Sequence, residues 1–441
     1  MTLARASRFW LLLGLVSFGG PAGQIALLHR ELVERRRWLS ERRYLHALNY
    51  CMVLPGPEAT QLATYLGWLM HGVPGGLIAG GLFLLPSALV LTGLSALYVQ
   101  WGQLPLLVSV FAVLKPAVLA IVLVAAWRLG RRMLHTPLLA GLAAAAFIAL
   151  ALLRWPYPLV VGLAALVGLA AARWRPAWIQ VAPRSSRPAV AAEIAAVAGG
   201  DPIHGDHTPT PNHALFSARR LAVILLLWGL ALLGPLAALA AWGGWNGTLA
   251  LMARFFSRVA LLSFGGAYAV LPYVAQGAVD QFGWLSADQM LDGLALGETT
   301  PGPLIMVLAF VGFMGGWNQA FAPGGGNWPS ALAATLVTVW FTFLPSFGFI
   351  LAGAPLVEAS RGDLRLGAPL TAITAAVVGV IASLAVFFAG PVLWSGGAPN
   401  GFAALVVAAS LIALLKLGWG VLPVIGSAAA VGVGMQLLGG P

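Results

Sequence analysis

Long apolar stretches separated by short polar loops run through nearly the whole chain. Most of them are long enough to cross ~30 Å of hydrocarbon as helices of roughly 20 residues. The pattern predicts an all-α polytopic integral membrane protein with about 13 hydrophobic segments. These segments are 9–28, 46–68, 73–99, 106–128, 137–153, 157–173, 219–242, 249–274, 289–314, 330–353, 367–390, 401–416 and 419–438.

Several short motifs of the first half recur in the second half. The motifs are Ser17-Phe18-Gly19-Gly20, Trp38-Leu39-Ser40 and Pro55-Gly56-Pro57. Each returns 246 positions later, as Ser263-Phe264-Gly265-Gly266, Trp284-Leu285-Ser286 and Pro301-Gly302-Pro303. Leu85-Pro86-Ser87 returns as Leu344-Pro345-Ser346 after 259 positions, which indicates an insertion of 13 residues around 323–327. The chain is therefore predicted to hold two homologous halves, 1–173 and 219–441, joined by a polar linker at 174–218.

The two halves are predicted to lie in the membrane in opposite orientations. Seven apolar segments precede the second copy of the serine motif, and an odd number of crossings inverts a repeat. The loop at residues 30–43 contains six arginines, whereas its counterpart at 276–289 contains Asp280 and Asp288 and no basic residue. Opposite loop charge is what the positive-inside rule expects for opposite orientation. Inverted repeats of this kind place their site near the bilayer midplane, between the copies.

Two arrangements of the segments are open. If every segment crosses and the N-terminus is cytoplasmic, the six-arginine loop lies outside, against the positive-inside rule. Alternatively, segments 9–28, 46–68, 249–274 and 289–314 enter and return, turning at their Gly or Pro-Gly-Pro breaks. We favour this re-entrant arrangement, because a Pro-Gly-Pro tip cannot continue a helix. It places the six-arginine loop and the linker in the cytoplasm.

Composition narrows the function classes. The chain is 60% hydrophobic and 8% charged with a net charge of +11, and its arginines gather at segment ends, as in membrane proteins rather than nucleic-acid-binding ones. Cys51 is the only cysteine, which excludes intramolecular disulfides and cysteine-based clusters. The sequence contains no Walker A motif, nucleophilic triad or redox-cofactor motif. We therefore expect no cofactor, no metal site and no enzymatic activity.

The paired breaks are the candidate binding elements. A half-helix that begins after a Pro-Gly-Pro turn offers unpaired N–H groups and a positive dipole end, which suit an anion. Both the glycines and the serines of the repeated motif supply bare backbone and hydroxyls, although small residues also serve close helix packing. Our predicted substrate-binding residues are Ser17, Phe18, Gly19, Gly20, Pro55, Gly56, Pro57, Lys115, Ser263, Gly265, Gly266, Pro301, Gly302 and Pro303.

Three charged residues at membrane depth are further candidates. Lys115 lies within an apolar run, where a cation costs on the order of 3 kcal/mol and so faces a cavity or a carboxylate. We interpret it as an anion-attracting charge, with a structural ion pair as the alternative. Glu58 and Glu298 flank the two Pro-Gly-Pro breaks and are predicted to carry a proton, or else to cap a half-helix. The paired Pro-Ser sites at 86–87 and 345–346 are interpreted as kinks.

With these motifs together, the stretches 18–68 and 263–312 resemble the two halves of a long-chain, two-domain chromate ion transporter. The resemblance implies a bacterial inner-membrane protein that exports chromate and confers chromate resistance, with sulfate as the similar ion. The paired motifs of that family match Phe18 to Gly20, Pro55 to Pro57, Phe264 to Gly266 and Pro301 to Pro303. The expected partners are chromate and membrane lipid, and a homodimer is compatible with the sequence.

Other functions stay open at this level. A sulfate or other oxyanion importer would use the same architecture with cation coupling. A membrane reductase would need an electron-carrying cofactor, for which the sequence has no motif. A sensor would need a folded signalling domain, and residues 174–218 are too short and irregular to form one.

Overall fold

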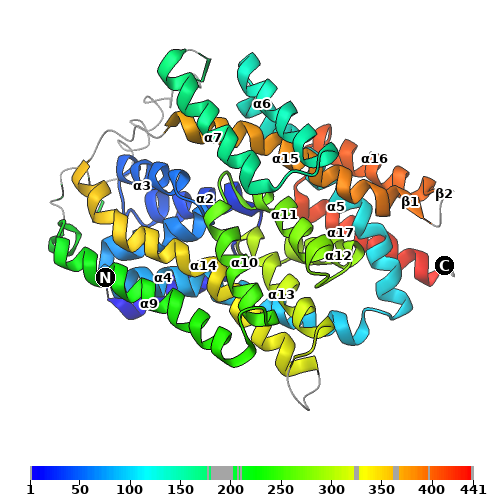
Figure 1. Ribbon diagram of the computed structural model, residues 1–441, viewed down its shortest axis with the longest axis horizontal. Helices are drawn as coiled ribbons and strands as arrows, with labels where there is room; N and C mark the ends of the chain where they lie inside the picture. The colour runs from blue at the N-terminus through cyan, green and yellow to red at the C-terminus, as the bar shows by residue number, and fades with distance from the viewer. Residues whose placement is uncertain are drawn as a thin grey trace.

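A computed structural model shows the chain as an assembly of helices (Figure 1). It describes residues 2–175, 178–179, 202–205, 208, 211–321, 327–360, 367–395 and 398–438. Within these residues, six helices are long and apolar enough to cross a membrane, and shorter apolar helices accompany them. A two-stranded hairpin of β1 (Trp394–Ser395) and β2 (Ala398–Pro399) is a minor exception. The predicted all-α polytopic class is confirmed.

The first copy consists of short helices followed by long ones. Its elements are α1 (Leu3–Leu15), α2 (Gly20–His29), η1 (Arg30–Arg35), α3 (Glu41–Val53), α4 (Glu58–Trp101), α5 (Pro105–Met133), α6 (Pro137–Phe147), η2 (Ile148–Leu152) and α7 (Tyr157–Trp174). The predicted segments 9–28 and 46–68 are thus divided, as the re-entrant arrangement requires. With a rise of about 1.5 Å per residue, α1 and α3 are each too short to cross ~30 Å of hydrocarbon.

The second copy repeats this order after η4 (Asn212–Ala214) and the additional helix α9 (Ala218–Gly243). Its elements are α10 (Thr248–Leu262), α11 (Ala267–Ala275), η5 (Gln276–Gln281), α12 (Ala287–Thr299), η6 (Leu304–Met306), α13 (Val307–Asn318), α14 (Asn327–Ser360), α15 (Gly367–Leu393), α16 (Gly401–Leu415) and α17 (Val421–Leu437). The repeat extends to fine detail, because η1 and α3 recur as η5 and α12 at the same 246-residue offset. In Figure 1, α9 runs along the edge of the molecule beside α14.

A difference between the copies explains the change of offset. Helix α4 departs from helical dihedral angles at His71 and Gly72, and the equivalent point of the second copy is the connection between α13 and α14. Gly72 has a φ of +66°, which favours glycine. The break in α4 therefore lies at His71 and Gly72, whereas the dihedral angles at Pro86 remain helical. The interpretation of the Pro-Ser site at 86–87 as a kink stays a prediction, because a helix can bend at a proline while its dihedral angles remain helical.

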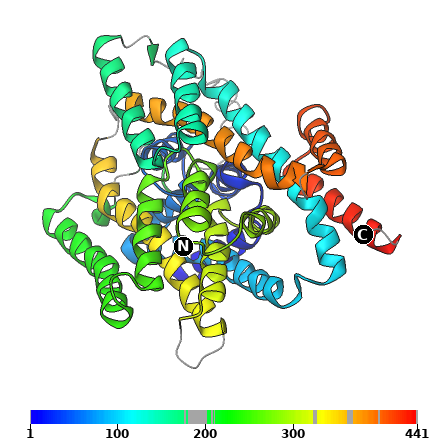
Figure 2. The same ribbon diagram turned by 45° about the vertical axis from the view of Figure 1, so that its right-hand side comes forward.

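The two copies interlock through their long helices. Helix α15 of the second copy packs against α6 and α7 of the first, and α5 of the first copy packs against α16 and α17 of the second. In Figures 1 and 2, the short helices α2, α10, α11 and α13 lie toward the middle, and the long helices surround them. The breaks in the short helices are thereby brought to the interior of the molecule.

Contacts of the six-arginine loop decide between the two arrangements of segments. The backbone N–H of His204 donates to the carbonyl of Trp38 at 2.9 Å, and that of Ile203 donates to the carbonyl of Arg37 at 3.1 Å. Arg43 also donates to the carbonyl of Thr208 at 2.7 Å. The loop and the described linker residues Ile203, His204 and Thr208 therefore lie on one side of the molecule. If all 13 segments crossed, loop and linker would lie on opposite sides, so the contacts contradict that arrangement and fit the re-entrant one.

Candidate functional site

The broken segments of the two copies meet through a pair of equivalent hydrogen bonds. The N–H of Gly56 donates to the carbonyl of Ser263 at 2.8 Å, and the N–H of Gly302 donates to the carbonyl of Ser17 at 2.6 Å. Each Pro-Gly-Pro turn thus binds the serine motif of the opposite copy. The two glycine N–H groups, which we expected to be free for an anion, instead join the two halves.

Glycine is required in these turns by conformation and by space. Gly56 has a φ of +124° and Gly302 a φ of +106°, values that L side chains rarely adopt. A Cβ atom added to Gly302 would overlap Ser87, and one added to Gly56 would overlap Ser346. Ser87 and Ser346 are equivalent positions of α4 and α14. Each turn therefore lies beside two serines of the other copy. Gly56 lies beside Ser263 and Ser346, and Gly302 lies beside Ser17 and Ser87.

The polar groups around the turns are buried and largely lack partners. Ser17, Ser87, Ser263 and Ser346 are all at most 1% exposed. The hydroxyls of the first three have no hydrogen-bond partner, and the Ser346 hydroxyl accepts only from Gln61 at 3.4 Å. The orphaned side-chain atoms nearby are Gln24 Oε1, Thr60 Oγ1 and Gln61 Oε1. Unpaired polar atoms in a dry interior are costly, so these groups require water or a polar ligand as a partner.

Helix termini add to the electrostatics of the cluster. Four helices begin directly after the breaks, namely α2, α4, α11 and η6, which leads into α13. None of the four has a side-chain cap on its N-terminus. Uncapped first-turn N–H groups and the positive dipole end attract anions. The cluster therefore offers donors to an anion, although the two turn glycines do not.

The predicted site residues are only partly brought together. The structure unites Ser17 with the turn at 301–303 and Ser263 with the turn at 55–57. Phe18 points outward and is 38% exposed. The hydroxyl of Tyr268 donates to Glu298, and Arg132 lies within electrostatic range of the partly buried Glu58.

Lys115 lies in an ion pair. Its ammonium is 3.1 Å from Asp288 Oδ1 and 3.6 Å from Asp292 Oδ1, both on α12. This is the alternative that the sequence left open for the lysine. Lys115 is thus not placed among the orphaned hydroxyls by any contact of the described residues.

The two serine motifs differ in how they are covered. At Gly265, an added Cβ would touch Thr374 and Val377 of α15 at 3.8 Å. At the equivalent Gly19 of the first copy, an added Cβ would touch only Gly23 of the adjoining α2, and the neighbouring Val16 is 58% exposed. The second motif is therefore covered by a long helix, whereas the first is open. Non-helical backbone at membrane depth is tolerated where it lines a water-filled cavity or is buried in protein.

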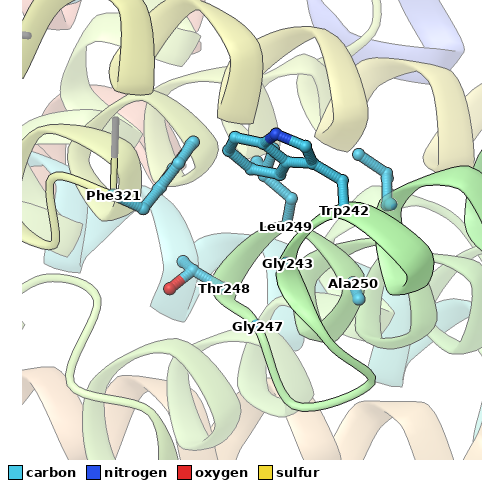
Figure 3. A pocket seen from close by; sticks show the side chains of 8 residues that line it. Trp242, Gly243, Gly247, Thr248, Leu249, Ala250 and Phe321 are labelled. Carbon is cyan, nitrogen blue, oxygen red and sulfur yellow. The ribbon is translucent and has the colours of Figure 1, made fainter. Parts of the chain in front are cut away.

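A separate pocket lies away from this cluster. It has a volume of about 290 Å³ and lies where α9 ends and α10 begins (Figure 3). Its lining residues are Leu239, Trp242, Gly243, Gly247, Thr248, Leu249, Ala250 and Phe321. Figure 3 shows mainly apolar side chains around it, with the Thr248 hydroxyl as a polar exception. It contains none of the predicted site residues.

Two groups of functional candidates were missed by the sequence. Ser87 and Ser346 were interpreted through their neighbouring prolines, although their repetition at a fixed offset was a signal that could have identified them. Asp292 and Tyr98 had no such signal, because neither is repeated in the other copy. Their role depends on which helices pack together.

Comparisons with known proteins agree with this architecture. The profile of the chromate transporter family matches residues 4–169 and 250–433. The chain is 32% identical over 375 residues to the chromate transport protein of Pseudomonas aeruginosa, covering 84% of this chain and 77% of that protein. It is 26% identical over 418 residues to the chromate transport protein of Cupriavidus metallidurans, covering 94% and 89%. It is 28% identical over 385 residues to a Synechococcus elongatus protein named a probable chromate transport protein, covering 87% and 84%.

No solved structure gave a significant match. The family profile covers most of both copies and leaves out the linker and α9. The apolar helices and these relatives together identify a multi-pass membrane protein. The chain belongs to the chromate transporter family.

Proposed function

We propose that this protein exports chromate across the bacterial inner membrane by secondary-active transport and thereby confers chromate resistance. The observation that carries the proposal is the buried cluster of unpartnered serine and threonine hydroxyls where the two inverted copies meet. A tetrahedral oxyanion has acceptors for several such donors at once. The names of the relatives, chromate transport proteins, agree with this substrate.

Energetics favour the outward direction. A membrane potential negative inside drives each negative charge outward by ~2.3 kcal/mol per 100 mV, and chromate carries two charges. Export can therefore run on the potential alone, and a titrating carboxylate would add the pH gradient. Glu58 and Glu298 are the candidates that the sequence offers at the turns. A sulfate importer would have to work against the same potential.

Placement of the chain follows from the re-entrant arrangement. The side that carries the six-arginine loop and the linker at 174–218 is assigned to the cytoplasm by the positive-inside rule. In this arrangement the broken segments of the first copy enter the membrane from the cytoplasmic side. We therefore assign the uncovered serine motif of the first copy to the cytoplasmic entrance for chromate. Lipid surrounds the outward faces of the long helices.

Transport direction is tested with inverted inner-membrane vesicles that contain the protein. We expect labelled chromate to accumulate in these vesicles when they are energised, and not in vesicles from cells that lack the protein. Excess sulfate measures selectivity in the same assay. Accumulation confined to right-side-out vesicles would contradict export and support an importer.

A further inference from the structure

A cluster of charged side chains joins α12 of the second copy to α4 and α5 of the first. Asp292 is 5% exposed and receives a hydrogen bond from the Tyr98 hydroxyl at 2.8 Å. Its other oxygen, Oδ1, faces Lys115 at 3.6 Å and has no hydrogen-bond donor. Asp288 lies one turn earlier on α12, contacts the same ammonium, and has a side chain that is 61% exposed. The exposed Asp288 therefore lies between the protein surface and the buried carboxylate of Asp292.

The fold itself does not require this cluster. His46 and Val357 occupy the positions equivalent to Asp292 and Tyr98, and His46 donates to the carbonyl of Val357 at 3.2 Å. The equivalent contact, between α3 of the first copy and α14 of the second, is thus made without an ion pair to a lysine, although the buried Glu358 follows Val357 and accepts from the Tyr65 hydroxyl. The position equivalent to the lysine is Thr374, which has no charge. A buried ion pair that only one of two equivalent contacts contains is costly to desolvate and indicates a function.

We propose that the Lys115–Asp292 pair is a proton-operated latch that couples chromate export to proton entry. Asp292 takes up one proton by way of the exposed Asp288, and its carboxylate becomes a neutral acid. Lys115 keeps its charge and its exposed contact with Asp288 but loses the buried one with Asp292, so the contact between α5 and α12 weakens. Loss of the proton to the other side restores the pair. This inference rests on the proposed function.

The surroundings of Asp292 support a single proton site. The titratable groups that face it are Lys115 from α5, Tyr98 from α4 and Asp288 from its own helix. The other helices packed against α12, namely α13, α15 and α17, contain no titratable side chain in their described residues. Glu298 lies at the far end of α12 and is held by Tyr268 of the same copy. The hydrogen bond between Tyr268 and Glu298 lies within the second copy, whereas the Lys115–Asp292 pair joins the two copies.

The test measures chromate uptake into proteoliposomes of purified protein, with and without an acidic lumen. We expect the pH gradient to accelerate the wild-type protein about tenfold, a change of ~1.4 kcal/mol in the barrier. Asp292→Asn should keep the rate without a gradient to within about twofold and lose the acceleration. Glu298→Gln tests the other candidate proton carrier. Glu358→Gln is the matched control, because Glu358 is also a buried carboxylate that accepts from a tyrosine hydroxyl, and it should keep the acceleration.

A second variant keeps the proposal testable if Asp292→Asn does not fold. Asp288→Asn removes the exposed acid through which the proton enters, and the protein should again transport chromate without acceleration. Normal acceleration in either variant, or its loss only in Glu298→Gln, would overturn the latch. A wild-type protein that moves chromate at a rate independent of the gradient would also overturn it and leave export intact. A wild-type protein that moves no chromate contradicts the proposed function instead.

Discussion

At the scale of single residues, the unpartnered hydroxyls of Ser17, Ser87 and Ser263 are the features that point most directly to a ligand. An unsatisfied buried hydroxyl destabilises the folded protein by about 1–3 kcal/mol, so its presence indicates a functional role. Serine hydroxyls in helices usually bond to the carbonyl four residues earlier, as Ser95 does to Leu91. Ser87 therefore differs from Ser95, an ordinary serine of the same helix α4.

Ser87→Ala should separate stability from transport. Because the hydroxyl has no partner, the empty protein should be as stable as the wild type or more stable, whereas chromate uptake should fall about tenfold if one donor worth ~1.4 kcal/mol is lost. Thermal unfolding in detergent and vesicle uptake measure the two effects.

Ser95→Ala is the matched control, since its hydroxyl is equally buried but bonded within α4. It should leave uptake unchanged. Equal uptake in both variants would remove Ser87 from the binding site.

The sequence could predict part of this site and not the rest. Ser17 and Gly56 were found because their motifs are repeated. The pairing of Ser87 with Gly302 joins residues more than 200 positions apart, and it depends on how α4 packs against the second copy. Lys115 was correctly expected to need a cavity or a carboxylate, but its partner could not be chosen from the sequence alone.

At the scale of elements, the Pro-Gly-Pro turns divide each broken segment into two half-helices. The sequence predicted these breaks and the boundaries of helices such as α7 and α9 closely, because Pro and Gly interrupt helical hydrogen bonding. It also placed the boundary between segments 46–68 and 73–99 where α4 departs from helical dihedral angles, at His71 and Gly72, just before Pro74. It did not predict that α4 would continue across this point from Glu58 to Trp101.

Gly302→Val should abolish transport. A valine at a φ of +106° is strained by roughly 1–2 kcal/mol, and its Cβ would overlap Ser87 and displace the turn from Ser17. Resistance to chromate in cells and the amount of inserted protein are measured together.

Gly93→Val serves as the control on α4, because an added Cβ there meets nothing within 4 Å. This variant should retain resistance. Full resistance with Gly302→Val would show that the turn is not part of the transport path.

At the scale of the whole molecule, the contact between the six-arginine loop and the linker places both on one side. The equivalent loop of the second copy lies instead beside the end of α13, where Gln319 donates to the carbonyl of Phe282 at 2.9 Å. Single cysteines at Arg36 and Asp280, in a Cys51→Ser background, should therefore react with a membrane-impermeant thiol reagent from opposite sides.

In intact cells, we expect the cysteine at position 280 to be labelled and the one at 36 to be protected until the cells are opened. Labelling of both from the periplasm would contradict the inverted, re-entrant arrangement. Labelling after permeabilisation confirms that both positions are reactive.

The unequal covering of the two serine motifs has a consequence for the opposite conformation of the protein. If the copies exchange conformations, α5 must cover the first motif as α15 now covers the second. The residue that would then face Gly19 is Lys115, because it occupies the position of Thr374. The same lysine would thus pair with the carboxylate of Asp292 in one conformation and with a bound dianion in the other.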